Sequence, residues 1–347
     1  MLNEMEKIYA AHPSFHDFMV EAAGGQKTGA AFSAEDGAEA LAAALGISAE
    51  EALKLTAAFV YCDAKAAVKM ADIAVAMNLE AIRGETGAFD LRLSAVARPF
   101  PGQIECAANV NALLQGSRVT TDEGRYGYGY DTHPRVQDAI CVRATPQTHG
   151  GSRDFLNWFK DCLEAPDCSP ELLEYAANGL ITALADLAHI SERRAFRLND
   201  TRLSYGLPMN LVPDAAGLNH GYPVVQSNQA AFVAELKLLT LPTAAVKRDT
   251  ECMASYALFK LVKGMALLRK TLAIEVLMCA QAMDIVHAKI PEIPFGKGTQ
   301  AVHDELRKTI SLMTENRFVS PDMCEAERLV ENGALLAAAE AAVGELR

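Results

Sequence analysis

Apolar residues recur along most of this chain at helical spacing, and the alternating pattern of a half-buried strand is nearly absent. The segments with helical spacing are 53–82, 109–114, 170–189, 226–241, 252–290 and 325–347. As a single helix, the segment 252–290 would extend roughly 55–60 Å at 1.5 Å per residue. A helix of that length is typical of the spine of a bundle. The pattern therefore predicts an all-α protein built as an elongated helix bundle.

Polar residues interrupt the apolar segments at only a few positions. Lys65, Lys69 and Asp72 fall at helical spacing within 53–82 and share one side of the predicted helix. We expect this side to form a narrow solvent-exposed stripe on an otherwise buried helix.

The organisation along the chain is simple. We expect residues 1–50 to form a helical appendage at the N-terminus and residues 51–347 to form the bundle. Glycine, proline and polar residues predict irregular structure at 120–134 and 199–223. No period of 20–50 residues recurs, which argues against a solenoid.

Composition excludes several classes of protein. The 347 residues include 44 acidic and 32 basic ones, which gives a formal net charge of −12. This excess of acid argues against a protein that binds nucleic acid or an anionic membrane. No uninterrupted apolar run reaches about 18 residues, so we expect no membrane span. The start lacks the pattern of a signal peptide, and we expect a cytoplasmic protein.

Cysteines and histidines add no metal or disulfide pattern. The eight cysteines are scattered, mostly in apolar segments, and none forms a CxxC pair. The eight histidines show no ligand spacing such as HExxH. We therefore expect reduced, buried thiols and no protein-held metal.

A possible carboxylate-binding site lies in the segment VQDAICVRATPQ, which starts at Val136. On a helix, Gln137, Ile140 and Arg143 would share one broad side at steps of three residues. An arginine beside an amide can hold a carboxylate through a two-point, charge-assisted contact. The alternative is an ion-paired arginine on the bundle surface, and the residues alone favour that alternative.

Other candidates have equally simple alternatives. Glu251 precedes the longest apolar segment, where an acid would also stabilise a helix N-terminus. The stretch GRYGYGYD from Gly124 would suit a lid or a pocket wall, and equally a surface loop. The charges of SERR from Ser191 suggest an ion pair at a helix corner, and FGKGT from Phe295 lacks the spacing of a phosphate-binding loop.

Taken in order, these segments resemble the histidine/phenylalanine ammonia-lyase family of aromatic amino acid lyases, from about residue 50 to the end. The matching stretches are RPFPGQIECAANVNALLQGS from Arg98, VQDAICVRATPQTHG from Val136, ISERR from Ile190, GLP from Gly206, GLNHGY from Gly217, QAAFVAELK from Gln229, and the acid Glu251. The resemblance implies an aspartase/fumarase-like bundle that assembles as a tetramer, with active sites that draw residues from more than one subunit.

The resemblance also implies a prosthetic group and site residues. The group is methylidene-imidazolone (MIO), an electrophile formed from an internal Ala-Ser-Gly, which activates an α-amino acid for loss of ammonia. By position, Arg143 would bind the substrate carboxylate and Gln137 would lie near the prosthetic group. Glu251 matches the acid that contacts the substrate side chain in histidine-specific members. The further substrate-binding candidates, from similar surroundings, are Asn219, Tyr222 and Gln226.

The sequence departs from the family at decisive positions. It contains no Ala-Ser-Gly, and Ser48 stands where the family keeps an asparagine that helps to hold the MIO group. Ile140 stands where the family has a tyrosine. We therefore expect no MIO-forming residues in this chain.

These departures suggest a subunit of a split or two-component ammonia-lyase or aminomutase, in which a partner chain supplies the MIO group. The helix faces of 53–82 and 252–290 would dock that partner, and the substrate would be a small amino acid, with histidine-like side chains favoured by Glu251. One alternative is a non-catalytic scaffold or regulator of an active homologue. Another is an enzyme that uses acid/base chemistry alone.

Overall fold

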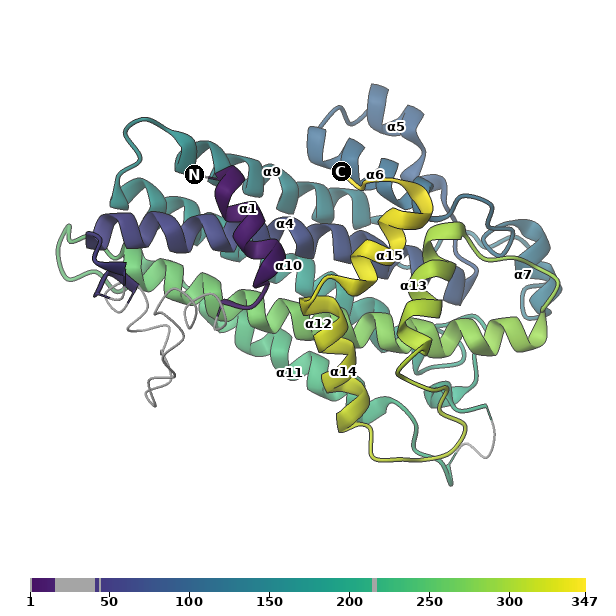
Figure 1. Ribbon diagram of the computed structural model, residues 1–347. Helices are drawn as coiled ribbons and strands as arrows, with labels where there is room; N and C mark the ends of the chain where they lie inside the picture. Colours follow the sequence, from purple (N-terminus) through teal and green to yellow (C-terminus); the bar gives the residue numbers. More distant parts are fainter. Residues whose placement is uncertain (1, 16–40, 44, 214–216) are drawn as a thin grey trace.

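The computed structural model describes residues 2–15, 41–43, 45–213 and 217–347. The structure is an elongated bundle, and all its regular elements in these ranges are helices (Figure 1). This confirms the predicted all-α fold. Five long helices lie side by side: α4 (Ala49–Ile82), α9 (Thr145–Glu164), α10 (Pro170–Leu198), α11 (Pro223–Leu239) and α12 (Ala254–Lys289).

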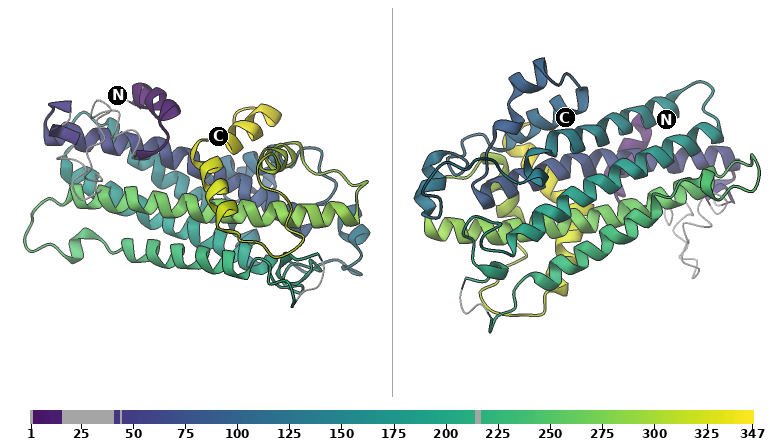
Figure 2. Two further views of the ribbon diagram at one scale, coloured as in Figure 1. Left: turned by 60° about the horizontal axis from the view of Figure 1, so that its bottom comes forward. Right: turned by 180° about the vertical axis from the view of Figure 1, so that it is seen from behind.

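Shorter helices cover the sides and one end of this bundle, as Figure 2 shows. They are α1 (Leu2–Ala11), α5 (Leu91–Val96), α6 (Pro101–Leu113), α7 (Asp122–Tyr128), α8 (Ile140–Arg143), α13 (Lys297–Arg307), α14 (Ser320–Glu331) and α15 (Ala334–Val343), with 3₁₀ turns at Gly87–Phe89, Met209–Leu211 and Thr243–Ala245. Helix α1 packs on α4, whereas α14 packs on α12. The predicted boundary at residue 50 stays a prediction, since 16–40 lie outside the described residues.

Three predictions about helices were wrong. Helix α9 was missed because Pro146, Gly150 and Gly151 disfavour a helix locally, although Pro146 sits in its first turn, where proline is tolerated. The segment 325–347 is not one helix, because Gly333 adopts φ +74° and separates α14 from α15. Helix α7 lies inside a segment predicted to be irregular.

Helix α13 was also missed, because long-range contacts position its glycine-rich start. A Cβ on Gly298 would lie 2.9 Å from the backbone Cα of Leu113, so this close approach requires glycine. The buried carboxylate of Glu80 accepts a hydrogen bond from the N–H of Gly296 at 2.8 Å and another from the hydroxyl of Thr299. Burial raises the pKa of Glu80 to about 7.

The two ends of α4 are fixed by local chemistry. Ser48 is the N-cap: its hydroxyl accepts the N–H of Glu51, and the Glu51 carboxylate accepts the N–H of Ser48 at 2.9 Å. This reciprocal capping box satisfies two N–H groups of the helix terminus. Arg83 ends the helix with φ 53°, in the left-handed region. Ser48 therefore serves as a helix cap in this chain.

The stripe predicted on α4 is only partly solvent-exposed: the Lys65 side chain is 44% exposed, whereas Lys69 and Asp72 are buried. Lys65 pairs with Glu6 of α1 at 2.8 Å, and Lys69 pairs with Glu340 of α15 at 3.0 Å. Asp72 has no exposed surface. Other helices of the same chain therefore cover the polar side of α4. The helix faces suggested as docking surfaces are also internal, since most residues of α4 and α12 are buried within this chain.

Asp72 lies at the centre of a buried network that joins α4, α6 and α9. Its carboxylate accepts hydrogen bonds from His149 Nδ1 at 2.7 Å, from Arg153 Nη2 at 2.7 Å and from Asn109 Nδ2 at 2.9 Å. Burial alone would raise the pKa of Asp72, but Arg153 and His149 lower it. Burial lowers the pKa of His149 to about 4, so its ring is neutral near pH 7.

A second buried pair connects α10 to α12. Arg194 Nε donates to Glu275 Oε1 at 2.6 Å and Nη2 donates to Oε2 at 2.9 Å, and both side chains are fully buried. Such a bidentate pair has one favourable geometry, so it fixes how α10 and α12 slide along each other.

Helix α12 is long and apolar enough to cross a membrane by length and composition, but 78% of its most apolar window is buried. A buried core helix of a soluble protein meets the same criteria of length and composition.

Replacing Glu275 by alanine would leave the Arg194 guanidinium buried without its counter-ion. We predict a loss of about 3–5 kcal/mol in the free energy of unfolding. The matched control is Glu4→Ala, which removes the exposed pair between Glu4 and Lys7 and should cost at most about 1 kcal/mol. Guanidinium unfolding followed by circular dichroism measures both, and equal losses would contradict the role given to Glu275.

Candidate active site

An open pocket with a volume of about 630 Å³ lies where α8 meets the C-terminal end of α10. Its lining residues are Gln137, Asp138, Ala139, Ile140, Cys141, Arg143, Arg193, Phe196, Arg197 and Tyr205. The structure thus brings together Gln137, Ile140 and Arg143, as the sequence suggested. The predicted reason was wrong in part, because α8 contains only four residues and Gln137 precedes it.

Buried ionic contacts hold the segment that carries Gln137. Asp138 pairs with Arg135 at 3.3 Å and accepts the N–H of Glu85 at 2.5 Å. Arg135 also pairs with Asp131 at 2.7 Å. The backbone on both sides of Gln137 is therefore anchored, although no regular element contains it.

The wall of the pocket at Tyr205 is anchored to the end of α4. The guanidinium of Arg135 lies 3.6 Å from the centre of the Tyr205 ring. The buried side chain of Arg83 donates to the carbonyls of Tyr205 and of Ala81, the latter at 2.6 Å. Burial lowers the pKa of Arg83 to about 10. Its guanidinium lies 3.9 Å from the centre of the Tyr128 ring, so the glycine- and tyrosine-rich stretch of α7 covers this anchor.

Arg143 has no partner among the residues that the structure describes, and its side chain is exposed. The alternative of an ion-paired surface arginine is therefore wrong within that part of the chain. Arg193 differs, because its Nε donates to Glu192 Oε2 at 2.5 Å, as the sequence suggested for SERR. An uncommitted guanidinium in an open pocket can bind an incoming carboxylate.

Sequence reasoning missed Arg197, which lines the same pocket one helical turn after Arg193. The reason is that the predicted helix ended at residue 189, whereas α10 continues to Leu198. A spacing of four residues on a continuous helix would have placed both arginines on one side.

The three further candidates lie at the same end of the bundle but do not line the pocket. Gln226 Nε2 donates to the buried Glu192 at 2.6 Å. Because Glu192 also pairs with Arg193, Gln226 helps to position that arginine in the pocket wall. Tyr222 is buried, its hydroxyl lies 3.4 Å from Gln281 Oε1, and burial raises its pKa to about 12.

Asn219 has a structural contact as well. Its side-chain oxygen accepts the N–H of Asn316 at 3.1 Å. Asn316 in turn accepts the N–H of His220 at 2.8 Å. In this conformation Asn219, like Tyr222 and Gln226, binds other parts of the chain.

Glu251 lies at the opposite end of the bundle. It is exposed, and its carboxylate accepts the N–H of Arg248 at 3.3 Å. It makes no capping hydrogen bond to α12, which begins at Ala254 without a side-chain cap.

Glu174, near the start of α10, fixes the loop that carries Glu251. Its carboxylate accepts the N–H of Met253 at 2.8 Å and pairs with Lys247 at 2.7 Å. From Glu174 to Arg193, α10 rises about 28 Å at 1.5 Å per residue. One copy of the chain therefore does not bring Glu251 to the pocket that contains Arg143.

One cluster has the residue types of a metal site. Potential ligand atoms of Asp72, Cys106 and His149 lie within 4.8 Å of one another, and all three residues are buried. The Asp72 carboxylate is already occupied by three donors, and Arg194 Nη1 lies 3.4 Å from His149 Nε2. Two guanidinium groups at this cluster, those of Arg153 and Arg194, oppose a cation, so we interpret the cluster as structural.

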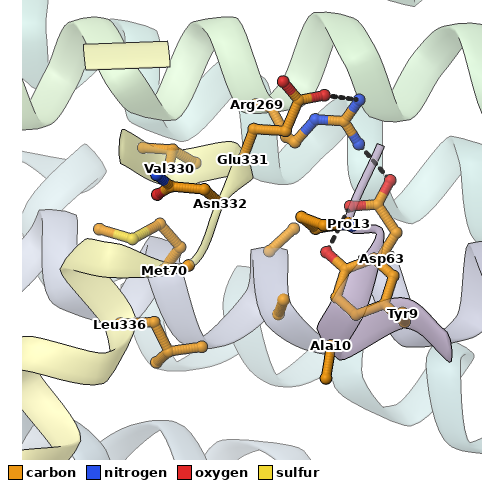
Figure 3. A pocket seen from close by; sticks show the side chains of 13 residues that line it. Tyr9, Ala10, Pro13, Asp63, Met70, Arg269, Val330, Glu331, Asn332 and Leu336 are labelled. Carbon is orange, nitrogen blue, oxygen red and sulfur yellow. Dashed lines mark hydrogen bonds and ion pairs between the residues drawn. The ribbon is translucent and has the colours of Figure 1, made fainter. Parts of the chain in front are cut away.

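A second pocket, of about 210 Å³, lies between α1, α4, α12 and the turn from α14 to α15 (Figure 3). Its polar groups bind one another: Arg269 contacts Asp63 and Glu331, and the Tyr9 hydroxyl donates to Asp63 at 3.2 Å. These mutual pairs stabilise the packing of α1. The pocket that contains Gln137 and Arg143 differs, because Arg143 and Arg197 form no ion pair with a described residue there.

We predict that Asp138→Ala loosens the Gln137 segment, because the variant loses the acceptor for the N–H of Glu85 and one of the two carboxylates that pair with Arg135. Amide hydrogen exchange of residues 136–143 should accelerate about tenfold, equivalent to ~1.4 kcal/mol of local stability. Asp122→Ala, which removes an exposed carboxylate from Arg125, is the matched control. Unchanged exchange in Asp138→Ala would show that the segment is held by other contacts.

Comparison with known proteins identifies the family and the fold of the chain. The model of the aromatic amino acid lyase family matches residues 23–166 and 167–308. A histidine ammonia-lyase from Sorangium cellulosum (strain So ce56) is 35% identical over 317 residues, which cover 82% of this chain and 59% of that protein. One from Alkaliphilus oremlandii (strain OhILAs) is 33% identical over 303 residues, or 79% of this chain and 57% of that protein.

Solved structures show the same fold. The crystal structure of tyrosine aminomutase from Streptomyces globisporus has a TM-score of 0.76 at 24% identity, covering 85% of this chain and 63% of that one. The structure of histidine ammonia-lyase from Trypanosoma cruzi has a TM-score of 0.72 at 23% identity, covering 88% and 63%. The chain spans 57–59% of the length of the two curated relatives. The family model and these relatives confirm the resemblance seen in the sequence: the chain belongs to the aromatic amino acid lyase family.

Proposed function

We propose that this chain is a subunit of a two-component aromatic amino acid ammonia-lyase or aminomutase, whose MIO group is supplied by a partner chain. The observation that carries the proposal is the position of Arg143, which is exposed and without a described partner in an open pocket that also contains Gln137. Family membership suggests the type of reaction, and the pocket suggests which residues this chain would contribute to it.

The residues of the pocket would bind and orient the substrate. The Arg143 guanidinium would hold the α-carboxylate through two parallel N–H···O bonds, which fix the direction of the amino acid. The Gln137 amide can donate to or accept from a neighbouring polar group of the substrate. Because Asp138 and Arg135 anchor the segment around Gln137, little ordering is needed when substrate binds.

The MIO group does not fit the residues of this chain. The sequence contains no Ala-Ser-Gly, and the Ser48 hydroxyl, at the position of the family's supporting asparagine, is committed to the cap of α4. When bound, MIO supplies an electrophile that makes the amino group a better leaving group. General-base catalysis alone contributes typically about 10²–10⁴-fold, too little for this elimination, so we propose a partner as the source.

Glu251 would serve the same reaction from another copy of the chain. A symmetric assembly can bring the Glu251 end of one copy to the Arg143 pocket of another. A carboxylate can accept a hydrogen bond from a ring N–H, so Glu251 favours a histidine-like substrate over a phenyl-bearing one. The tetramer expected from the family would provide such contacts.

A non-catalytic scaffold is the second candidate. Ile140, at the position of the family's tyrosine, is 68% exposed in the pocket and brings no group that can move a proton. In a chain that takes no part in catalysis, isoleucine in place of the tyrosine would not reduce activity. The two candidates differ in what the loss of Arg143 would do.

We predict that Arg143→Ala lowers kcat/KM for ammonia release by about 10²-fold in the complex with the MIO-bearing chain, without loss of assembly. The loss corresponds to ~2.7 kcal/mol, the range of a charge-assisted bidentate contact. Arg92→Ala is the matched control, because Arg92 is exposed and, among the described residues, forms an ion pair with Asp90 alone. Unchanged kcat/KM in an intact complex would favour the scaffold, and activity of the chain alone would contradict the two-component proposal.

A further inference from the structure

The pocket that contains Arg143 holds a second uncommitted guanidinium. Arg197 is half-buried and, like Arg143, has neither an ion pair nor a side-chain hydrogen bond with any described residue. Binding one carboxylate requires only one of these two arginines.

Charge in the pocket is unbalanced in favour of cations. Of the ionised side chains that line it, three are arginines and one is the carboxylate of Asp138. Asp138 shares Arg135 with Asp131, and Arg193 pairs with Glu192. Arg143 and Arg197 therefore have no ion pair with a described residue, although the charge of Asp200 lies close enough to interact with Arg197.

The same pocket presents apolar surface between polar groups. Ile140 is 68% exposed and Phe196 is 43% exposed, and both line the pocket. Water-exposed apolar side chains beside unpaired cations suit a ligand with an apolar body and anionic groups.

We propose that the pocket binds a dianionic organic ligand, with one acidic group on Arg143 and the second on Arg197. This inference rests on the proposed function for the role of Arg143. It replaces histidine itself, a monocarboxylate, by an amino acid with a ring and a second acidic group as the expected substrate. Arg197 would thus determine specificity, because a monocarboxylate leaves its charge without a partner.

Two aromatic acids that differ by one carboxylate test this proposal. Phenylsuccinate is 3-phenylpropionate with a second carboxylate, so the pair isolates the added charge. Isothermal titration of the full-length chain at low salt should give about five- to tenfold tighter binding of phenylsuccinate, the size of one partly exposed charge-assisted contact. The preference should shrink in 1 M salt, where the Debye length is about 3 Å.

Arginine variants assign the two charges. Arg197→Gln should bind both acids with affinities within about twofold, since only the second contact is lost. Arg202→Gln, at an exposed arginine outside the pocket, is the matched control and should keep the full preference. Circular dichroism verifies that each variant is folded.

The outcomes separate this inference from the proposed function. If the wild-type chain binds both acids equally, or neither acid at 20 mM, the dianion site is overturned. If Arg197→Gln keeps the preference, Arg197 is not the second contact and the inference also fails. The proposed function loses its carboxylate contact only if Arg143→Gln leaves the affinity for 3-phenylpropionate unchanged.

Discussion

The bidentate ion pair between Arg194 and Glu275 fixes α10 against α12 in the centre of the bundle, and the positions of both candidate site regions depend on it. The pair has one good geometry in a fully buried setting, where a shift along the helix axis would separate two charges without water. The helix α10 therefore carries Arg193 to one end of the bundle and Glu174 to the other in a fixed register.

This register explains why the candidate site residues of the chain form two separate sets. Arg143 and Gln137 lie near the C-terminal end of α10, whereas Glu251 is held beside its N-terminal end through Met253. Neither set resembles a complete active site. The sharing of sites between subunits that we propose would account for this division, because a rigid helix can present half of a site at each end.

The sequence predicted the long helices because their apolar residues repeat over many turns, and it predicted the association of Gln137 with Arg143. It could not predict α13, whose start depends on the contact of Gly298 with Leu113 and on the buried Glu80 carboxylate. It placed Lys69 in water because the covering helix α15 is distant in the sequence. Arg197 was missed for a local reason, since the helix was ended nine residues too early.

The most direct test is complementation between two inactive variants. Arg143→Ala and Glu251→Ala chains are each assembled with the MIO-bearing partner, separately and after mixing in equal amounts, and ammonia release is measured. If one site takes Arg143 from one copy and Glu251 from another, random mixing restores both residues in about one quarter of the sites. We predict little activity in either variant alone and recovery to about a quarter of the wild-type rate in the mixture. No recovery on mixing would contradict the account.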